Sequence, residues 1–309
     1  MSFSAQIKEE ISKLNTTKTE DIAELSAIIR NSESLNNINI VTENRSVANR
    51  VYNLIKKIYN QTLTITIRKR SGFSTSTVYI LNLNENYKQI LKDLSIIDND
   101  NNYLSYPKEY LIGDSEEIRA YLKGLFEVCG SISDPKTSGY HLEFIINEEV
   151  YAKKIMELLN NFDLNSKVIK REKNYMVYIK EAEKISDFLR IIKAYNAVMY
   201  FEDIRIYRDY KNMSNRLNNC EIANMDKIFQ TANNQIKDIE KLEKYDIIDT
   251  LDDKLKEAIN YRLQYKESSL QELADIMSNE LNYNISKSGL NHRFRKIKEI
   301  INKIEKNKC

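Results

Sequence analysis

The feature that most constrains the fold is a glycine inside an apolar helical run. Residues 115–129, SEEIRAYLKGLFEVC, have the apolar spacing of a helix, and Gly124 interrupts it. A glycine within a helix costs about 1 kcal/mol relative to alanine, so it needs a structural reason. The segment LSAIIRNSE (25–33) has the same pattern as LKGLFEVCG (122–130), with Ala27 in the place of Gly124. Small residues at both places let two helix backbones approach closely, which predicts a pseudo-twofold contact between two half-domains.

The order of the predicted elements also repeats. Residues 19–97 predict a helix over 19–31, an extended segment, a helix over 45–59, two alternating strands and a helix over 85–97. Residues 115–195 predict a helix, a hairpin, a helix over 148–160, two strands and a helix over 183–195. Both segments follow the order αββαββα. We therefore predict an α+β fold, with residues 1–110 and 111–212 as two halves of a duplicated domain.

A helical segment follows the two halves. The apolar residues from Ile222 to Ile239 are spaced 3-4-3-4-3, which predicts a helix with one narrow apolar face. We expect that face to pack on a neighbouring domain, and dimerisation through it stays open as the alternative. A long helix over 215–243 is expected to separate the duplicated domain from an all-helical one. These observations place a helical linker at residues 213–250 and the last domain at residues 251–309.

Composition excludes several classes of site. The chain has only two histidines, which argues against a Ser-His-Asp triad or a histidine-rich metal centre. Its three cysteines are far apart, which favours reduced thiols in a cytoplasm over disulfides or a zinc cluster. The first residues, MSFSAQIKEEI, predict an amphipathic helix instead of a signal peptide, and no apolar run approaches membrane-spanning length. We therefore expect a cytoplasmic protein with no metal, no cofactor and no membrane partner.

The carboxy-terminal segment predicts a helix-turn-helix. Ser269 and Glu272 have capping-box spacing, and Ser286 can cap a second helix that starts at Lys287. A preceding helix over 253–266 would complete a three-helix domain. The expected loop, SNELNYN, is longer than the three or four residues of a compact helix-turn-helix, so either the first helix extends towards Asn279 or the turn is a loose variant.

The last helix has one apolar and one basic face. Residues 285–309 contain eight lysines and arginines against two glutamates, a local charge of +6 in a chain of +2. An α-helix fits the major groove of DNA, where Ser, Asn and Arg side chains reach base edges and Lys or Arg side chains neutralise phosphates. The alternative is a basic, solvated helix that only packs on the rest of the chain. The predicted DNA-binding residues are Lys287, Ser288, Asn291, His292, Arg293, Arg295 and Lys296.

The paired helices resemble the LAGLIDADG homing-endonuclease motif. In that family the eighth motif residue of each helix is an acid that holds divalent metal ions, which activate water. Here those positions are Ser32 and Cys129, and neither is a hard oxygen-anion ligand for magnesium. Glu33 and Glu127 are nearby in the sequence but out of place. The pattern predicts a folded domain with no catalytic residues and no metal site. Basic runs at 68–70 and 167–173 could contact DNA or form a solvated face.

Over essentially its whole length the chain is similar to the WhiA family of bacterial regulators. The stretches that carry the resemblance include AELSAIIRNSESL, RAYLKGLFEVCGSISDPKTSGYHLE, FEDIRIYRDYKNMSNRLNNCEIAN and ISKSGLNHRFRKI. The resemblance implies a sequence-specific transcription regulator that acts in sporulation, cell division or chromosome segregation, with a non-cleaving endonuclease-like half. It implies double-stranded promoter DNA as a partner, a nucleoid location, and a sigma factor or another regulator as a candidate protein partner. The first hairpin is shorter than the family's, which puts any surface role of that hairpin in doubt.

Two rival functions remain open from the sequence. One is an active homing endonuclease or RNA maturase, which would use Glu33 or Glu127. The other is a protein-interaction scaffold in cell division with a vestigial helix-turn-helix. The sequence does not determine the oligomeric state.

Overall fold

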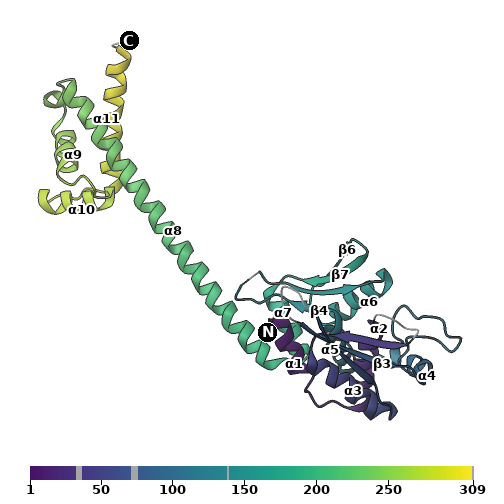
Figure 1. Ribbon diagram of the computed structural model, residues 1–309. Coiled ribbons are helices and arrows are strands. Elements are labelled where there is room, and N and C mark those ends of the chain that lie inside the picture. Colours follow the sequence, from purple (N-terminus) through teal and green to yellow (C-terminus); the bar gives the residue numbers. More distant parts are fainter. Residues whose placement is uncertain (33–36, 71–75, 138, 308–309) are drawn as a thin grey trace. The chain divides into compact units, whose positions relative to one another are not determined.

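A computed structural model describes residues 1–32, 37–70, 76–137 and 139–307 (Figure 1). The chain divides into two compact units, residues 1–208 and 209–309. Within the described ranges no helix is both long and apolar enough to cross a membrane. The first unit contains two apolar cores, and the second unit contains a separate one.

The first unit begins with an amino-terminal helix and the first repeat. The helix α1 spans Phe3–Ile11 and is capped by Ser2. The repeat forms a three-stranded antiparallel sheet of order β1-β3-β2 with helices around it. Its elements are α2 (Lys18–Arg30), β1 (Ile38–Thr42), α3 (Arg45–Tyr59), β2 (Thr64–Arg70), β3 (Ser76–Leu83) and α4 (Tyr87–Asp93).

The second repeat forms a four-stranded antiparallel sheet of order β4-β5-β7-β6. A short 3-10 helix, η1 (Glu109–Leu111), precedes it. The elements are α5 (Ser115–Cys129), β4 (Gly130–Ile132), β5 (Leu142–Ile146), α6 (Glu149–Asn160), β6 (Lys167–Arg171), β7 (Asn174–Ile179) and α7 (Ala182–Ile191).

The predicted α+β class and duplicated unit are confirmed, with one difference between the repeats. The second repeat has the full order αββαββα, whereas the described part of the first has only β1 between α2 and α3. Residues 130–141 give room for β4 and a turn before β5, but only residues 31–37 separate α2 from β1. Both central helices nevertheless begin in the same way. Thr17 with Glu20, and Asp114 with Glu117, form complete capping boxes.

The close contact between α2 and α5 accounts for the glycine. A Cβ atom placed on Gly124 would lie 2.4 Å from the carbonyl oxygen of Glu24 and 3.1 Å from its Cα. No side chain fits there unless the backbones move apart. The predicted close approach of two helices is therefore confirmed, and α2 lies against α5 along the centre of the first unit.

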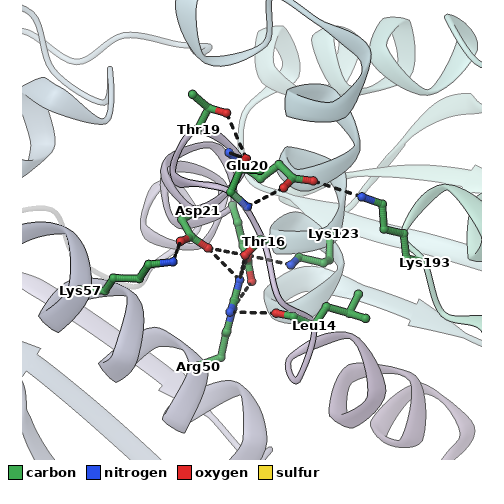
Figure 2. Close-up of polar contacts among 11 residues, drawn as sticks. Leu14, Thr16, Thr19, Glu20, Asp21, Arg50, Lys57, Lys123 and Lys193 are labelled. Atoms are coloured by element: carbon green, nitrogen blue, oxygen red, sulfur yellow. Dashed lines mark hydrogen bonds and ion pairs between the residues drawn. The ribbon is translucent and has the colours of Figure 1, made fainter.

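A buried ion-pair network surrounds this contact (Figure 2). The Glu24 carboxylate is fully buried and accepts hydrogen bonds from Arg50 Nε at 2.9 Å and Nη2 at 2.6 Å. Lys123 Nζ of α5 lies 2.8 Å from Glu24 Oε2. Asp21, also buried, pairs with Arg50 at 3.1 Å and with Lys57 at 2.5 Å. Three helices, α2, α3 and α5, are thus joined by paired charges, which the burial of these carboxylates requires.

The second unit contains a helical core. A continuous helix, α8, spans Tyr195–Lys244 and crosses from the first unit into the second. It begins well before the predicted residue 215, because no glycine or proline occurs within it. The elements that follow are η2 (Ile248–Thr250), α9 (Asp253–Gln264), α10 (Leu270–Leu281) and α11 (Lys287–Asn307).

The apolar face predicted from Ile222 to Ile239 divides into two parts. Ala232 and Ile239 are buried, and Ile239 packs into the core of α9, α10 and α11 together with Leu242. The earlier residues of the same row, Ile222, Met225 and Phe229, are exposed. The packed helical module therefore includes the end of α8, which lies in the segment expected to be a linker.

Replacing Gly124 with alanine should destabilise the first unit. The added methyl group must displace the backbone of Glu24, and overpacking of this kind costs about 1–3 kcal/mol in free energy of unfolding. Chemical denaturation followed by circular dichroism measures the change. The matched control is Gly139→Ala, because nothing lies within 4 Å of the Cβ position there. Equal stability of the two variants would contradict the contact described here.

Candidate nucleic-acid interface

The helix α11 is positioned by the turn that precedes it. Ser269 and Glu272 form the predicted capping box of α10, with N–H···O distances of 2.7 and 3.2 Å. The helix runs on to Leu281 and ends at Asn282, whose φ of 55° is left-handed. The connection to α11 is therefore residues 282–286, because the first helix extends past Asn279. Ser278 Oγ accepts a hydrogen bond from Ile285 N at 2.9 Å, which holds this turn against α10.

The two faces of α11 differ as predicted. Leu290, Phe294, Ile297 and Ile301 are buried in the core with α9 and α10. The other side of the helix is open to solvent over its first three turns. The exposed residues there are Lys287, Ser288, Asn291, His292, Arg295 and Lys296. The helix thus presents hydrogen-bonding and cationic groups together on one uncovered surface.

Arg293 is placed differently from the other six predicted residues. Its side chain is only 14% exposed, and Nη1 lies 3.3 Å from Glu257 Oε2. Nη1 also donates to the Lys254 carbonyl at 3.2 Å, and Nη2 donates to the Tyr283 hydroxyl at 3.4 Å. These contacts tie α11 to α9. Arg293 therefore orients the helix, and its cation is already paired within the protein.

Arg262 is a buried residue that sequence reasoning missed. It is 1% exposed, and Nη1 donates to the carbonyl oxygens of Tyr265 at 3.2 Å and Ser268 at 2.7 Å. Its guanidinium lies 5.7 Å from the centre of the Phe294 ring on α11. Burial lowers the pKa of Arg262. The available signal was its place in the apolar row of α9, three and seven residues after Ile259 and Leu255.

The basic runs of the first unit lie on edge strands. Arg68 and Lys69 are exposed on β2, and Lys170 and Arg171 are exposed on β6. Each of these strands is the last in its sheet. Lys167 on β6 is exposed as well. These exposed cations at two sheet edges, with Glu172 beside Arg171, do not by themselves distinguish a DNA contact from a solvated surface.

The ends of α2 and α5 are where an endonuclease of the resembling type would hold metal. Ser32 and Cys129 line one cavity of about 390 Å³, so the two eighth motif positions do come together. Glu33 lies outside the described residues. The same cavity is lined by Arg30, whose guanidinium donates to the carbonyl oxygens of Ser95 and Leu104. One carboxylate among the described residues, Glu148, also lines the cavity, so a cation and a single anion lie where such a site would need paired acids.

These residues do not fit a divalent metal ion. Ser32 offers a neutral hydroxyl, and burial raises the pKa of the Cys129 thiol to about 12. The thiol donates to the Leu125 carbonyl at 3.3 Å, as a protonated group does. Magnesium and calcium need hard anionic oxygen ligands. In the described part of the chain, no three acidic, histidine or cysteine side chains are grouped as a metal site would require.

Glu127 does not replace the missing acids. It is 1% exposed, and neither carboxylate oxygen has a hydrogen-bond partner among the described residues. Burial, followed by the charge of Glu24, raises the pKa of Glu127 well above its usual value, against the opposing effects of Lys123, Arg50 and Lys8. A carboxyl group held in its neutral form is a poor metal ligand.

Three family profiles match the chain in sequence. They are the WhiA N-terminal LAGLIDADG-like domain over residues 18–97, the WhiA LAGLIDADG-like domain over 118–211 and the WhiA C-terminal HTH domain over 214–301. A Bacillus cytotoxicus protein named probable cell division protein WhiA is 43% identical over 98% of this chain and 97% of its own length. A Bacillus cereus protein of the same name is 42% identical over the same shares.

The fold is similar to one solved structure over nearly the whole chain. The crystal structure of full-length WhiA from Thermatoga maritima has a TM-score of 0.58, with 23% sequence identity. It covers 98% of this chain and 99% of that chain. This likeness supports the arrangement of two LAGLIDADG-like halves followed by a helical domain.

Glu127→Gln should stabilise the protein at neutral pH. The pKa of Glu127 is higher in the folded state than in the unfolded state, where it is about 4.3. The neutral carboxyl group therefore makes its full contribution to stability only at pH values below about 4.3. That contribution is lost as pH rises towards the folded-state pKa, since the unfolded chain then releases a proton that the folded chain retains. The glutamine variant avoids this loss. Its melting temperature relative to wild type should rise between pH 4 and pH 8.

The matched control for this measurement is Glu85→Gln, which changes an exposed glutamate. Its melting temperature should follow that of the wild type at every pH. A Glu127→Gln variant less stable than wild type at pH 8 would show that the ionised carboxylate stabilises the fold.

Proposed function

Because the chain belongs to the WhiA family, we propose that it is a sequence-specific DNA-binding regulator that does not cleave DNA. Its helix-turn-helix, residues 251–309, reads the duplex, and its two LAGLIDADG-like halves, residues 1–110 and 111–212, serve as a folded platform. The proposed partner is double-stranded promoter DNA in the cytoplasm, at the nucleoid. Relatives named as probable cell division proteins support a role in division. Chromosome segregation and sporulation are the further roles that we infer from the family.

The observation that carries this proposal is the uncovered polar face of α11. Six residues with hydrogen-bonding or cationic side chains are exposed there, while the opposite face fills the core. A solvated structural helix would need no such concentration of one charge sign. An α-helix with groups of this kind fits the major groove and can contact base edges and phosphates together.

The exposed residues divide by chemistry. Ser288, Asn291 and Arg295 are proposed to contact base edges, since hydroxyl, amide and guanidinium groups can hydrogen-bond there. Lys287 and Lys296 are proposed to contact phosphates, and His292 to lie against the groove. Arg293 holds α11 on α9 through Glu257 and contributes to DNA binding by orienting the helix.

The endonuclease-like half is proposed to be inactive because its motif positions have lost their acids. Ser32, Cys129 and Arg30 line the cavity at the helix ends. Glu148 is the one carboxylate among the described residues that line this cavity, and beside a thiol of raised pKa and a guanidinium it does not replace the pair of acids that the motif uses. The duplicated domain, residues 1–212, keeps its fold through the contact of α2 with α5 and through the ion-pair network, and neither depends on a metal.

DNA binding is tested with duplexes selected from a random pool by the full chain. On the selected duplex, Lys296→Ala should lower the slope of log affinity against log salt by about 1, because one phosphate contact is lost. Arg295→Ala should cost about 1–3 kcal/mol and relax the preference at one base position. Fluorescence anisotropy at several salt concentrations measures both effects.

Lys237→Ala is the matched control, because it removes an exposed lysine of α8 that is not on the proposed interface. Its affinity and salt slope should equal those of the wild type. Arg293→Ala should lower the melting temperature as well as the affinity. Unchanged affinity and slope in both Lys296→Ala and Arg295→Ala would reject α11 as the DNA reader and favour a scaffold function.

The absence of cleavage is tested with supercoiled plasmid carrying the selected site. After long incubation with the full chain and magnesium, the plasmid should remain supercoiled. Magnesium-dependent nicking that disappears in Glu127→Gln would overturn the proposal of an inactive domain. Chromatin immunoprecipitation would then separate promoter occupancy from wider binding to the chromosome.

A further inference from the structure

The helix α8 has an exposed apolar row that its own unit leaves uncovered. Tyr210, Met213 and Leu217 are 74%, 64% and 56% exposed. Cys220, an exposed free cysteine, follows Leu217 in the row, and Ile206 lies one turn before Tyr210. None of these residues belongs to the core of α9, α10 and α11. Large apolar side chains in a continuous exposed row cost solvation free energy that a partner would recover.

The spacing of this row is that of a coiled coil. Positions 206, 210, 213, 217 and 220 are separated by four, three, four and three residues, as the a and d positions of a heptad are. In this register Tyr210 and Leu217 take a positions, and Met213 and Cys220 take d positions. Ile222, Met225 and Phe229 belong to the other row, which enters the core at Ala232 and Ile239.

The charges beside the row favour a second copy over an acidic or basic partner. Residues 209–229 contain three acidic and three basic side chains, so the segment has no net charge. A partner of one strong charge sign would gain nothing from this surface. A second copy of the same helix meets no net repulsion and buries the same apolar row from both sides.

The polar residues in and beside the row are compatible with a parallel pairing. Asn224 follows at the next a position, where a buried Asn in a parallel dimer can hydrogen-bond to its own copy and set the register. Arg216 takes a g position and Glu221 the e position five residues later. In a parallel pair the g residue of one helix faces that e residue of the other, so Arg216 would meet Glu221 of the second copy twice per dimer.

We propose that two copies of this chain associate through a parallel coiled coil of α8 centred on Met213, Leu217 and Cys220. This interface is separate from the polar face of α11. The dimer is formed by residues of α8, and it forms without DNA.

The first test uses Cys220 as a reporter in the full chain. In a background with Cys129→Ser and Cys309→Ser, a short bismaleimide cross-linker should join two chains through Cys220, because a d residue faces its own copy in a parallel pair. Sedimentation equilibrium without the cross-linker should show a dimer. A monomer at every concentration would overturn the proposal, and so would a dimer in which Cys220 cannot be cross-linked.

The second test compares two charge substitutions on α8. Leu217→Glu places a charge in the row and should raise the dimer dissociation constant by about tenfold or more, equivalent to about 1.4 kcal/mol. Asn215→Glu adds the same charge at an exposed position outside the row and should leave dimerisation unchanged. Both positions are exposed, so circular dichroism should show wild-type folding. Equal effects of the two substitutions would reject the proposed row as the interface.

The third test addresses the pairing of Arg216 with Glu221. Arg216→Glu and Glu221→Arg should each weaken the dimer, because each places like charges opposite one another. The double variant should recover wild-type association, since the pairs form again with reversed sign. Failure of the double variant to recover would rule out the parallel register.

Discussion

The first unit depends on one close approach, between the backbones of Glu24 and Gly124. Because α2 and α5 approach this closely, the side chain at position 24 lies in the interior. That side chain is a carboxylate, and a buried carboxylate must be paired. Arg50 of α3 and Lys123 of α5 provide that pairing. The contact thus determines more than the absence of a side chain at residue 124. It places an anion at the centre of the unit and joins the cations of two other helices to it, so the relative positions of α2, α3 and α5 follow from a single constraint.

The same pair of helices is held together by contacts that need no metal ion. Their first turns carry complete capping boxes, and their middle turns carry the backbone contact and the ion pairs. Apolar packing continues into the last turns, where Val128 of α5 lies against the core that includes Ile28 and Ile29 of α2. At the ends of the two helices, Arg30, Ser32 and Cys129 line a cavity in which neither eighth motif position carries an acid. The groups suited to contact a nucleic acid are gathered instead on α11, in a module with its own core.

Local patterns predicted most of the elements and both faces of α11. Gly124 identified the close helix contact, because a glycine in an apolar helical run weakens the helix unless a neighbouring backbone needs the space. The capping-box spacing of Ser269 and Glu272 located the start of α10, and the apolar row of α11 separated core from surface. These features were readable because each depends on residues a few positions apart.

Local sequence patterns do not predict contacts between residues that are far apart in the chain. The pairing of Arg50 with Glu24 joins positions 26 residues apart, and the local sequence around neither residue predicts it. Arg293 was grouped with the DNA-binding residues because its charge suited them, whereas Glu257, 36 positions earlier, faces it in the fold. The predicted length of α8 is too short because its many polar residues give no clear apolar pattern, although no glycine or proline interrupts the helix.

The position of Ser32 and Cys129 in one cavity has an electrostatic consequence. Two carboxylates lining one cavity would repel each other whenever no metal was present, whereas the neutral side chains of Ser32 and Cys129 do not. Neutral side chains at these two helix ends therefore leave the folded state with no electrostatic cost that a bound cation would have to offset.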